Sequence, residues 1–231
     1  MPQPLSAIPK ATKVTLGNNM DSPSRHRPDL ALLAMNVVAE WSLLESFVNG
    51  LFVKLLGTNA GAAAAIFSSI RSQAGQRDAF QAVAASALDN DPEKQDLIVA
   101  VLEVCNKAAK TRNRVAHWVW GHSDNLPNAV LLADPNAVTT YMAKLVDWAA
   151  ARERGEKAAY PDIDRRRVYA YTEQDFTEAS QRIQRAMWLV SHVRMAMPPE
   201  LPGALSLTQL SAEPELQKEL DRLRRDRQSD Q

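Results

Sequence analysis

The chain has 231 residues, which is enough to bury a full hydrophobic core in one domain with extensions, or in two domains at most. Lys and Arg together number 27, as do Asp and Glu, so no overall positive charge steers the chain toward nucleic acid. The single cysteine, Cys105, excludes a disulfide within the chain and fits a reducing, cytoplasmic compartment.

Residues 1–26 contain four prolines among scattered polar residues. This composition predicts a disordered or loosely packed N-terminal arm. The segment lacks the continuous apolar core of a signal peptide, so secretion is not expected. No run in the chain reaches the roughly 20 apolar residues of a membrane span, so we expect no membrane contact.

The first long helix should run from Pro28 to Leu56. Proline suits the first turn, and Asp29 suits the positive end of the helix dipole. Apolar residues recur along one face at helical spacing. Glu45 falls among them, between Trp41 and the next apolar position, so we predict an inward-facing carboxylate there.

Two shorter helices should follow, over residues 60–70 and 72–88, with Ile66 and Ile70 as the inward anchors of the first. The third long helix should start at Pro92 and end near His117, and Cys105 lies on its apolar face. Its opposite face should be solvated, and it carries three cations: Lys107, Lys110 and Arg114.

Arg112 lies in the middle of the apolar face of this third helix, with Asn113 and His117 one turn apart along its edge. An unpaired buried guanidinium costs several kcal/mol. Arg112 should therefore either close a buried ion pair or face a cleft that binds an anion. Glu45 is the expected partner, and Glu40 is the alternative.

Residues 118–171 depart from the helical pattern. Short strands are predicted near 118–120, 129–132 and 167–171, and the last two should pair antiparallel. A helix should open at Asp134-Pro135, with Met142 and Val146 on its inward face. The run Arg165-Arg166-Arg167 should either meet a ligand or lie in a solvated loop.

The last core helix should start after Thr172 and end before Pro198. Residues 198–231 then form a Pro-rich segment and a charged helical tail, which should pack on a partner or, more in keeping with its charge, fray in solvent. The predicted fold is therefore mainly all-α. It is an up-and-down helical bundle over residues 27–197, with a small β-hairpin and helix inserted at 118–171 between the third and fourth long helices.

The sequence offers no cofactor motif. The four histidines lack metal-ligand spacing, and no phosphate-binding loop or nucleophile elbow is present, so neither a metal nor another cofactor is expected. Any chemistry should come from Arg112, Asn113 and His117.

The pattern Arg112-Asn113-x-x-x-His117 at the end of the third long helix resembles the R-N-x-x-x-H signature of the HEPN superfamily. Trp41 and Glu45 in the first helix, and the AHWVWG segment after the motif, add to the resemblance, which covers roughly residues 28–196. The superfamily consists of small α-helical proteins, many of them metal-independent ribonucleases. The 118–171 insertion departs from a bare bundle.

The resemblance implies an RNA endonuclease that leaves a 2′,3′-cyclic phosphate. An imidazole can act as general acid or base, and a guanidinium can stabilise a phosphorane, which gives the roles of His117 and Arg112. Asn113 would support them, and Glu45 would position Arg112. One histidine per chain is sparse for both proton transfers, so a homodimer is expected. A role as toxin or phage-defence effector, with an antitoxin or regulator as partner, belongs to the same reading.

Two other classes stay open, because fold and motif do not fix function. The chain could be a non-catalytic HEPN-like dimer that binds RNA or a nucleotide. It could also be a helical scaffold in which Glu45 and Arg112 form only a core pair. The surroundings of His117 discriminate, since burial of that imidazole by the insertion would argue against catalysis.

Overall fold

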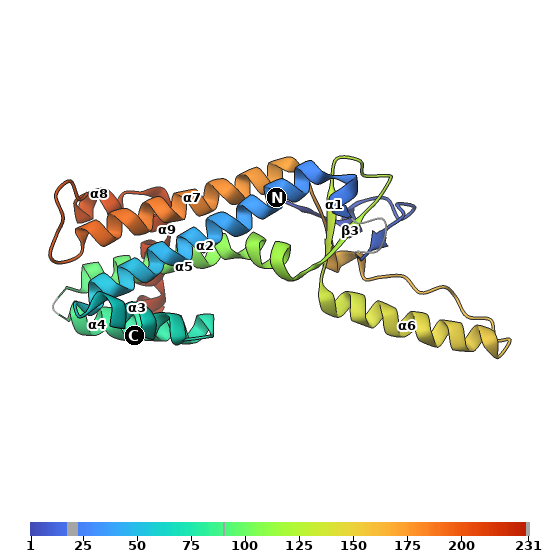
Figure 1. Cartoon of the computed structure of the whole chain (residues 1–231), viewed down its shortest axis with the longest axis horizontal. Helices are drawn as coiled ribbons and strands as arrows, with labels where there is room; N and C mark the ends of the chain where they lie inside the picture. Colours follow the sequence, from blue (N-terminus) through green and yellow to red (C-terminus); the bar gives the residue numbers. More distant parts are fainter. Residues whose placement is uncertain (18–22, 90, 230–231) are drawn as a thin grey trace. The chain divides into compact units, whose positions relative to one another are not determined.

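The computed structural model describes residues 1–17, 23–89 and 91–229, and the protein is mainly α-helical with a small antiparallel sheet (Figure 1). The prediction of a mainly α fold with a small β insertion is confirmed. The chain divides into two compact units. We call Met1–Val38 with Thr111–Ser180 the sheet unit, and Ala39–Lys110 with Gln181–Gln231 the helical unit.

Three long helices follow the predicted periodicity: α2 (Pro28–Leu56), α5 (Pro92–His117) and α7 (Glu173–Ala196). The carboxylate of Asp91 caps α5 by accepting a hydrogen bond from the backbone N of Lys94 at 3.0 Å. Gly57 follows α2 at φ +62°, a conformation in which a Cβ would be strained.

The helical unit also contains α3 (Ala60–Ser69) and α4 (Gln73–Ala87). The predicted anchors of α3 are wrong in one respect, because Ile66 is 54% exposed and the buried positions are Ala63 and Phe67. In an alanine-rich helix every face is apolar, so packing selects the buried side. The ring of Phe67 lies 4.6 Å from that of Phe52, between centroids, and both contact Phe80.

The C-terminal tail forms α8 (Leu207–Ser211) and α9 (Pro214–Ser229), and the expectation that it frays in solvent is wrong. Leu216 and Leu220 are buried, and so is Glu219, at 2% exposure. Lys107 of α5, expected on a solvated face, forms an ion pair with this glutamate. Helix α9 therefore packs within the helical unit.

The sheet unit is built on five short strands in the order β1-β5-β4-β3-β2, all antiparallel. Their bounds are β1 Gln3–Pro4, β2 Thr15–Leu16, β3 Val119–His122, β4 Val130–Ala133 and β5 Val168–Tyr171. The predicted antiparallel pairing of the last two is confirmed, with Leu131 opposite Ala170. Gly121 lies inside β3. A Cβ there would stand 2.5 Å from the backbone O of Thr15, so glycine permits the close approach of β2.

Central strand β4 is buried on both faces. Because side chains alternate along a strand, Leu131 and Ala133 share one face, where they pack with Leu5, Ile163 and neighbouring apolar residues. The helix α6 (Pro135–Glu153) follows β4 and is capped by Asp134. Its predicted inward face is only partly correct, since Met142 is 50% and Val146 69% exposed.

The N-terminal residues differ from the expected disordered arm. They supply both edge strands of the sheet, the turn η1 (Leu5–Ala7) and the short helix α1 (Pro23–His26), while residues 18–22 lie outside the described part. Arg165, in the turn η2 (Arg165–Arg167), holds this segment by donating to the backbone oxygens of Pro9 at 3.0 Å, Lys10 and Thr12 at 3.3 Å, and Leu5 at 3.4 Å.

The rest of the arginine run is also paired within the chain. Arg166 forms an ion pair with Asp164 at 3.0 Å, and Arg167 forms one with Asp134 at 2.7 Å. We expected Arg165-Arg166-Arg167 to meet a ligand or to lie in a solvated loop. Instead, Arg165 holds the N-terminal segment and Arg167 holds the start of α6.

Replacing Arg165 with alanine should release the N-terminal segment. Only the bond to Pro9 is short, so we expect the free energy of unfolding to fall by about 1.5–3 kcal/mol, which is the contribution of one hydrogen bond from a charged group. Limited proteolysis should cut within residues 5–17 sooner than in the wild type. The control is Arg166→Ala, because Arg166 is 80% exposed and, among the described residues, its side chain bonds only Asp164. Equal cleavage of both variants would contradict the clamp.

One described helix, α2, is long and apolar enough to cross a membrane by length and composition. From the sequence we had expected no segment of that kind. One such helix is weak evidence for a membrane span, because core helices of soluble proteins and signal sequences pass the same test. Of the apolar window in α2, 22% is buried, and the helix carries core residues such as Leu30, Val37 and Leu51 at 0% exposure. The structure is compatible with a soluble protein.

Candidate functional site

The three predicted catalytic residues lie at the C-terminal end of α5, within the sheet unit. Arg112 and Asn113 are half-buried. The Nη1 atom of Arg112 donates a hydrogen bond to the Oδ1 atom of Asn113 at 3.1 Å. This bond fixes the orientation of the Asn113 amide and uses one of the five donors of the guanidinium.

His117 is the last residue of α5, and its side chain is exposed. The insertion that follows it does not bury the imidazole. At about 100° per residue, His117 points roughly 140° away from Arg112 around the helix and roughly 40° from Asn113. The amide and the imidazole therefore share a face, whereas Arg112 lies closer to the opposite side of the helix from His117. A phosphate held between Arg112 and His117 of one chain would have to sit beyond the end of the helix.

The helix end that carries His117 is anchored. Trp120, in β3, donates a hydrogen bond from Nε1 to the backbone O of Val115 at 3.1 Å, and Val115 itself is buried. The backbone N of Trp118 bonds the O of Arg114 at 2.9 Å and so continues the helical pattern past His117. The backbone around the imidazole is thus held on both sides, although the side chain is open to solvent.

Arg114, expected on a solvated face, is half-buried in an aromatic cluster. Its guanidinium carbon lies 4.9 Å from the ring centre of Trp118 and 4.5 Å from that of Tyr169. Its Nη1 donates to the hydroxyl oxygen of Tyr171 at 3.2 Å. Burial raises the pKa of Tyr171, and the bond from Arg114 opposes that rise. We call Arg114, Trp118 and Tyr169 the stacking cluster.

The spacing of Arg114 and Trp118, four residues apart across the C-terminal end of α5, was a signal for this contact in the sequence. The contribution of Tyr169 had no local signal, because it depends on the position of β5. In sequence, Arg114 lies three residues before the candidate catalytic His117 and Trp118 lies one residue after it.

Glu45, predicted to face inward and position Arg112, is exposed. It lies four residues beyond Trp41, which is 5% exposed, at the margin of the buried face of α2. Glu45 belongs to the helical unit and Arg112 to the sheet unit, so their pairing stays a prediction. The side chain of Glu45 lines a pocket of the helical unit.

Among the described residues, no group of three or more His, Cys, Asp or Glu side chains is placed to hold a metal ion. The chemistry that the α5 end can offer is that of one exposed imidazole, one amide and two guanidiniums. These groups can exchange a proton with a substrate and can bind a phosphate.

Fold and site together define a mainly α-helical protein that has a small antiparallel sheet and an Arg-Asn-His set at the end of a long helix. Comparison of the chain with models of known families, with curated proteins and with solved structures found no match.

Proposed function

We propose that the protein is a metal-independent RNA endonuclease that acts as a homodimer, with His117 as general acid or base and Arg112 stabilising the phosphorane. The observation that carries the proposal is an exposed imidazole on a fixed helix end, one turn after the bonded pair of Arg112 and Asn113. An imidazole that water can reach can also be reached by a ribose hydroxyl.

The reaction needs two proton transfers. The neutral imidazole of His117 takes the proton of the ribose 2′-OH, and the 2′-oxygen attacks phosphorus while the bond from phosphorus to the 5′-oxygen breaks. Arg112 stabilises the additional negative charge on the phosphorane. The leaving 5′-oxygen takes a proton from the imidazolium of a second copy, and the products are a 2′,3′-cyclic phosphate and a 5′-hydroxyl.

Exposed apolar side chains of the sheet unit support the dimer. Leu32 and Met35 on α2 are 64% and 65% exposed, and Met142 and Val146 on α6 form a second exposed pair one helical turn apart. Exposed apolar pairs such as these can bury surface when a second copy packs against them. A second copy would also supply the second histidine that the reaction requires.

Binding of RNA or a nucleotide without turnover is the second candidate, and the stacking cluster favours it. Aromatic rings and guanidinium planes stack on unpaired bases, and the cluster offers both beside His117. Under either proposal the protein acts in the cytoplasm. A role as toxin or phage-defence effector, with an antitoxin or regulator as its partner, would follow from the ribonuclease.

The test is cleavage of single-stranded RNA by the purified full chain in the presence of EDTA. We expect fragments that end in 2′,3′-cyclic phosphate, and no cleavage of an oligonucleotide with 2′-O-methyl groups throughout, because the attacking hydroxyl is blocked. Light scattering of the same sample should give the mass of a dimer. Binding of RNA with no cleavage would select the second candidate, and cleavage of the 2′-O-methyl strand would contradict the mechanism.

A further inference from the structure

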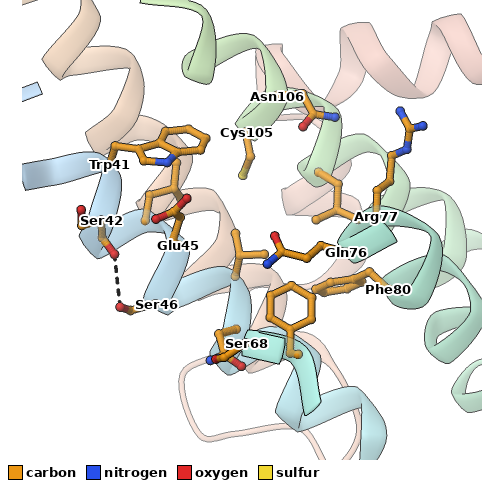
Figure 2. A pocket seen from close by; sticks show the side chains of 15 residues that line it. Trp41, Ser42, Glu45, Ser46, Ser68, Gln76, Arg77, Phe80, Cys105 and Asn106 are labelled. Atoms are coloured by element: carbon orange, nitrogen blue, oxygen red, sulfur yellow. Dashed lines mark hydrogen bonds between the residues drawn. The ribbon is translucent and has the colours of Figure 1, made fainter. Parts of the chain in front are cut away.

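A pocket of about 400 Å³ lies within the helical unit and is lined by residues of α2, α3, α4 and α5 (Figure 2). Its volume falls in the range of small-molecule sites in proteins. All of its lining residues lie between positions 41 and 106, so the pocket shares no residue with the α5 end that carries His117.

The pocket is apolar on its inner side. Two aromatic rings, those of Phe67 and Phe80, lie at the base with their centroids 6.1 Å apart, and Trp41 adds a third ring. Leu44 and Leu102 complete the apolar lining and are themselves buried. Flat apolar walls of this kind suit an aromatic ring system, since such rings gain from stacked and edge-on contacts as well as from burial.

Two hydrogen-bond acceptors lie on the α2 wall of the pocket, the Glu45 carboxylate and Oδ1 of Asn49. Glu45 is exposed at the mouth, and within the helical unit no described residue forms an ion pair or hydrogen bond with its carboxylate. Asn49 lies one helical turn further along α2, and its Oδ1 atom is buried without a hydrogen-bond partner among the described residues. A buried acceptor that lacks a donor costs about 1–3 kcal/mol, so a donor from a ligand would be favoured here.

Three side chains on the other walls do not donate a hydrogen bond to Glu45 or to Oδ1 of Asn49. Arg77 is half exposed, its Nε atom lies 3.9 Å from the carboxylate of Asp78, and in Figure 2 it extends away from Glu45. The Nε2 of Gln76 already donates to the backbone O of Ile70 at 3.0 Å. Burial raises the pKa of Cys105 to about 12, so its thiol is neutral at physiological pH.

From this arrangement we propose that the pocket binds a small aromatic molecule that carries an ammonium group. The ring lies against Trp41, Phe67 and Phe80. The ammonium donates hydrogen bonds to the Glu45 carboxylate and to Oδ1 of Asn49. The site is distinct from the proposed ribonuclease centre and does not require it.

The test compares three compounds of one shape with different charge. Tryptamine carries the ammonium, tryptophol replaces it with a neutral hydroxyl, and indole-3-acetate carries a carboxylate. Isothermal titration calorimetry with the full chain should give tryptamine a dissociation constant of about 1 mM or lower. Tryptophol should bind about tenfold more weakly, and indole-3-acetate should show no saturable binding.

Glu45→Gln removes the charge and keeps the shape of an exposed side chain, so folding should be unaffected. It should weaken tryptamine about tenfold and leave tryptophol unchanged. Glu153→Gln, the same change on exposed α6, is the control and should leave both compounds unchanged. The proposal would be overturned if tryptamine did not bind at millimolar concentration or if all three compounds bound equally. It would also be overturned if Glu45→Gln bound tryptamine as tightly as the wild type does.

Discussion

Replacing His117 with alanine should lower the rate of RNA cleavage by about 10²–10⁴-fold, the usual contribution of a positioned general acid or base. The side chain is exposed at the end of α5 and makes no side-chain hydrogen bond to another described residue. Its removal should therefore leave the fold intact, and the loss should appear in the rate of cleavage. The measurement is the single-turnover rate on a labelled single-stranded RNA.

The control for this variant is Lys110→Ala. Lys110 is exposed on the same helix, so its removal tests whether any loss of local positive charge or helical order slows cleavage. We expect its rate to stay within a few-fold of the wild type, because a single surface charge contributes little. Equal rates for wild type and His117→Ala would remove the histidine from the mechanism, and equal losses in both variants would point to RNA binding.

Local sequence signals were sufficient for the long helices. The bounds of α2 and α5 agree with the predicted ones, because proline in the first turn and a capping Asp91 mark their ends chemically. The pairing of β4 and β5 was also predictable, since both segments are short, apolar and separated by a helix. The helix bounds depend on residues that are close in sequence, and each of the two strands was marked by its own apolar residues.

The face of a helix that is buried was predicted less well. Glu45 was assigned to the core because it falls near Trp41 and Val48 on a helical projection, yet it is exposed. A deviation of about 40° around the helix is enough to move a residue from core to solvent, and periodicity alone does not resolve that angle. On α6 the apolar face is real, but no described part of the chain covers Met142 and Val146.

The N-terminal segment could not be predicted from its composition. Its prolines suggest irregular structure, and β1 and β2 contain only two residues each. They are held because the edges of β5 and β3 offer backbone partners and because Arg165, roughly 155 residues away in sequence, binds several carbonyl oxygens. Contacts of this range leave no local pattern in the sequence.

The candidate site was predicted in part for the same reasons. The bond between Arg112 and Asn113 joins neighbouring residues, and the exposure of His117 follows from its place at a helix end. The stacking cluster depends on Tyr169, which arrives from another strand. The pocket needs four helices at once, so neither its volume nor its unbonded Asn49 could be inferred before the fold was known.

Replacing both Lys107 and Arg222 with methionine should lower the free energy of unfolding by about 3–5 kcal/mol, the cost of leaving a buried charge without its partners. The carboxylate of Glu219 is 2% exposed and forms ion pairs with both cations. The Nε atom of Arg222 lies 3.2 Å from Oε2 but is not aligned for a hydrogen bond, so that contribution is electrostatic. Methionine keeps the aliphatic stems and removes only the charges.

Glu219→Gln removes the carboxylate and leaves both cations in place. It should lower the free energy of unfolding by less than half as much as the double substitution. The side chains of Lys107 and Arg222 are 48% and 43% exposed, so water can solvate them once the carboxylate is gone. Urea unfolding followed by circular dichroism measures the difference, with Lys218→Met/Arg224→Met as a control of the same composition on the exposed side of α9. Equal losses in the Lys107/Arg222 variant and in the control would mean that α9 is held by its leucines alone, with no contribution from the buried charge.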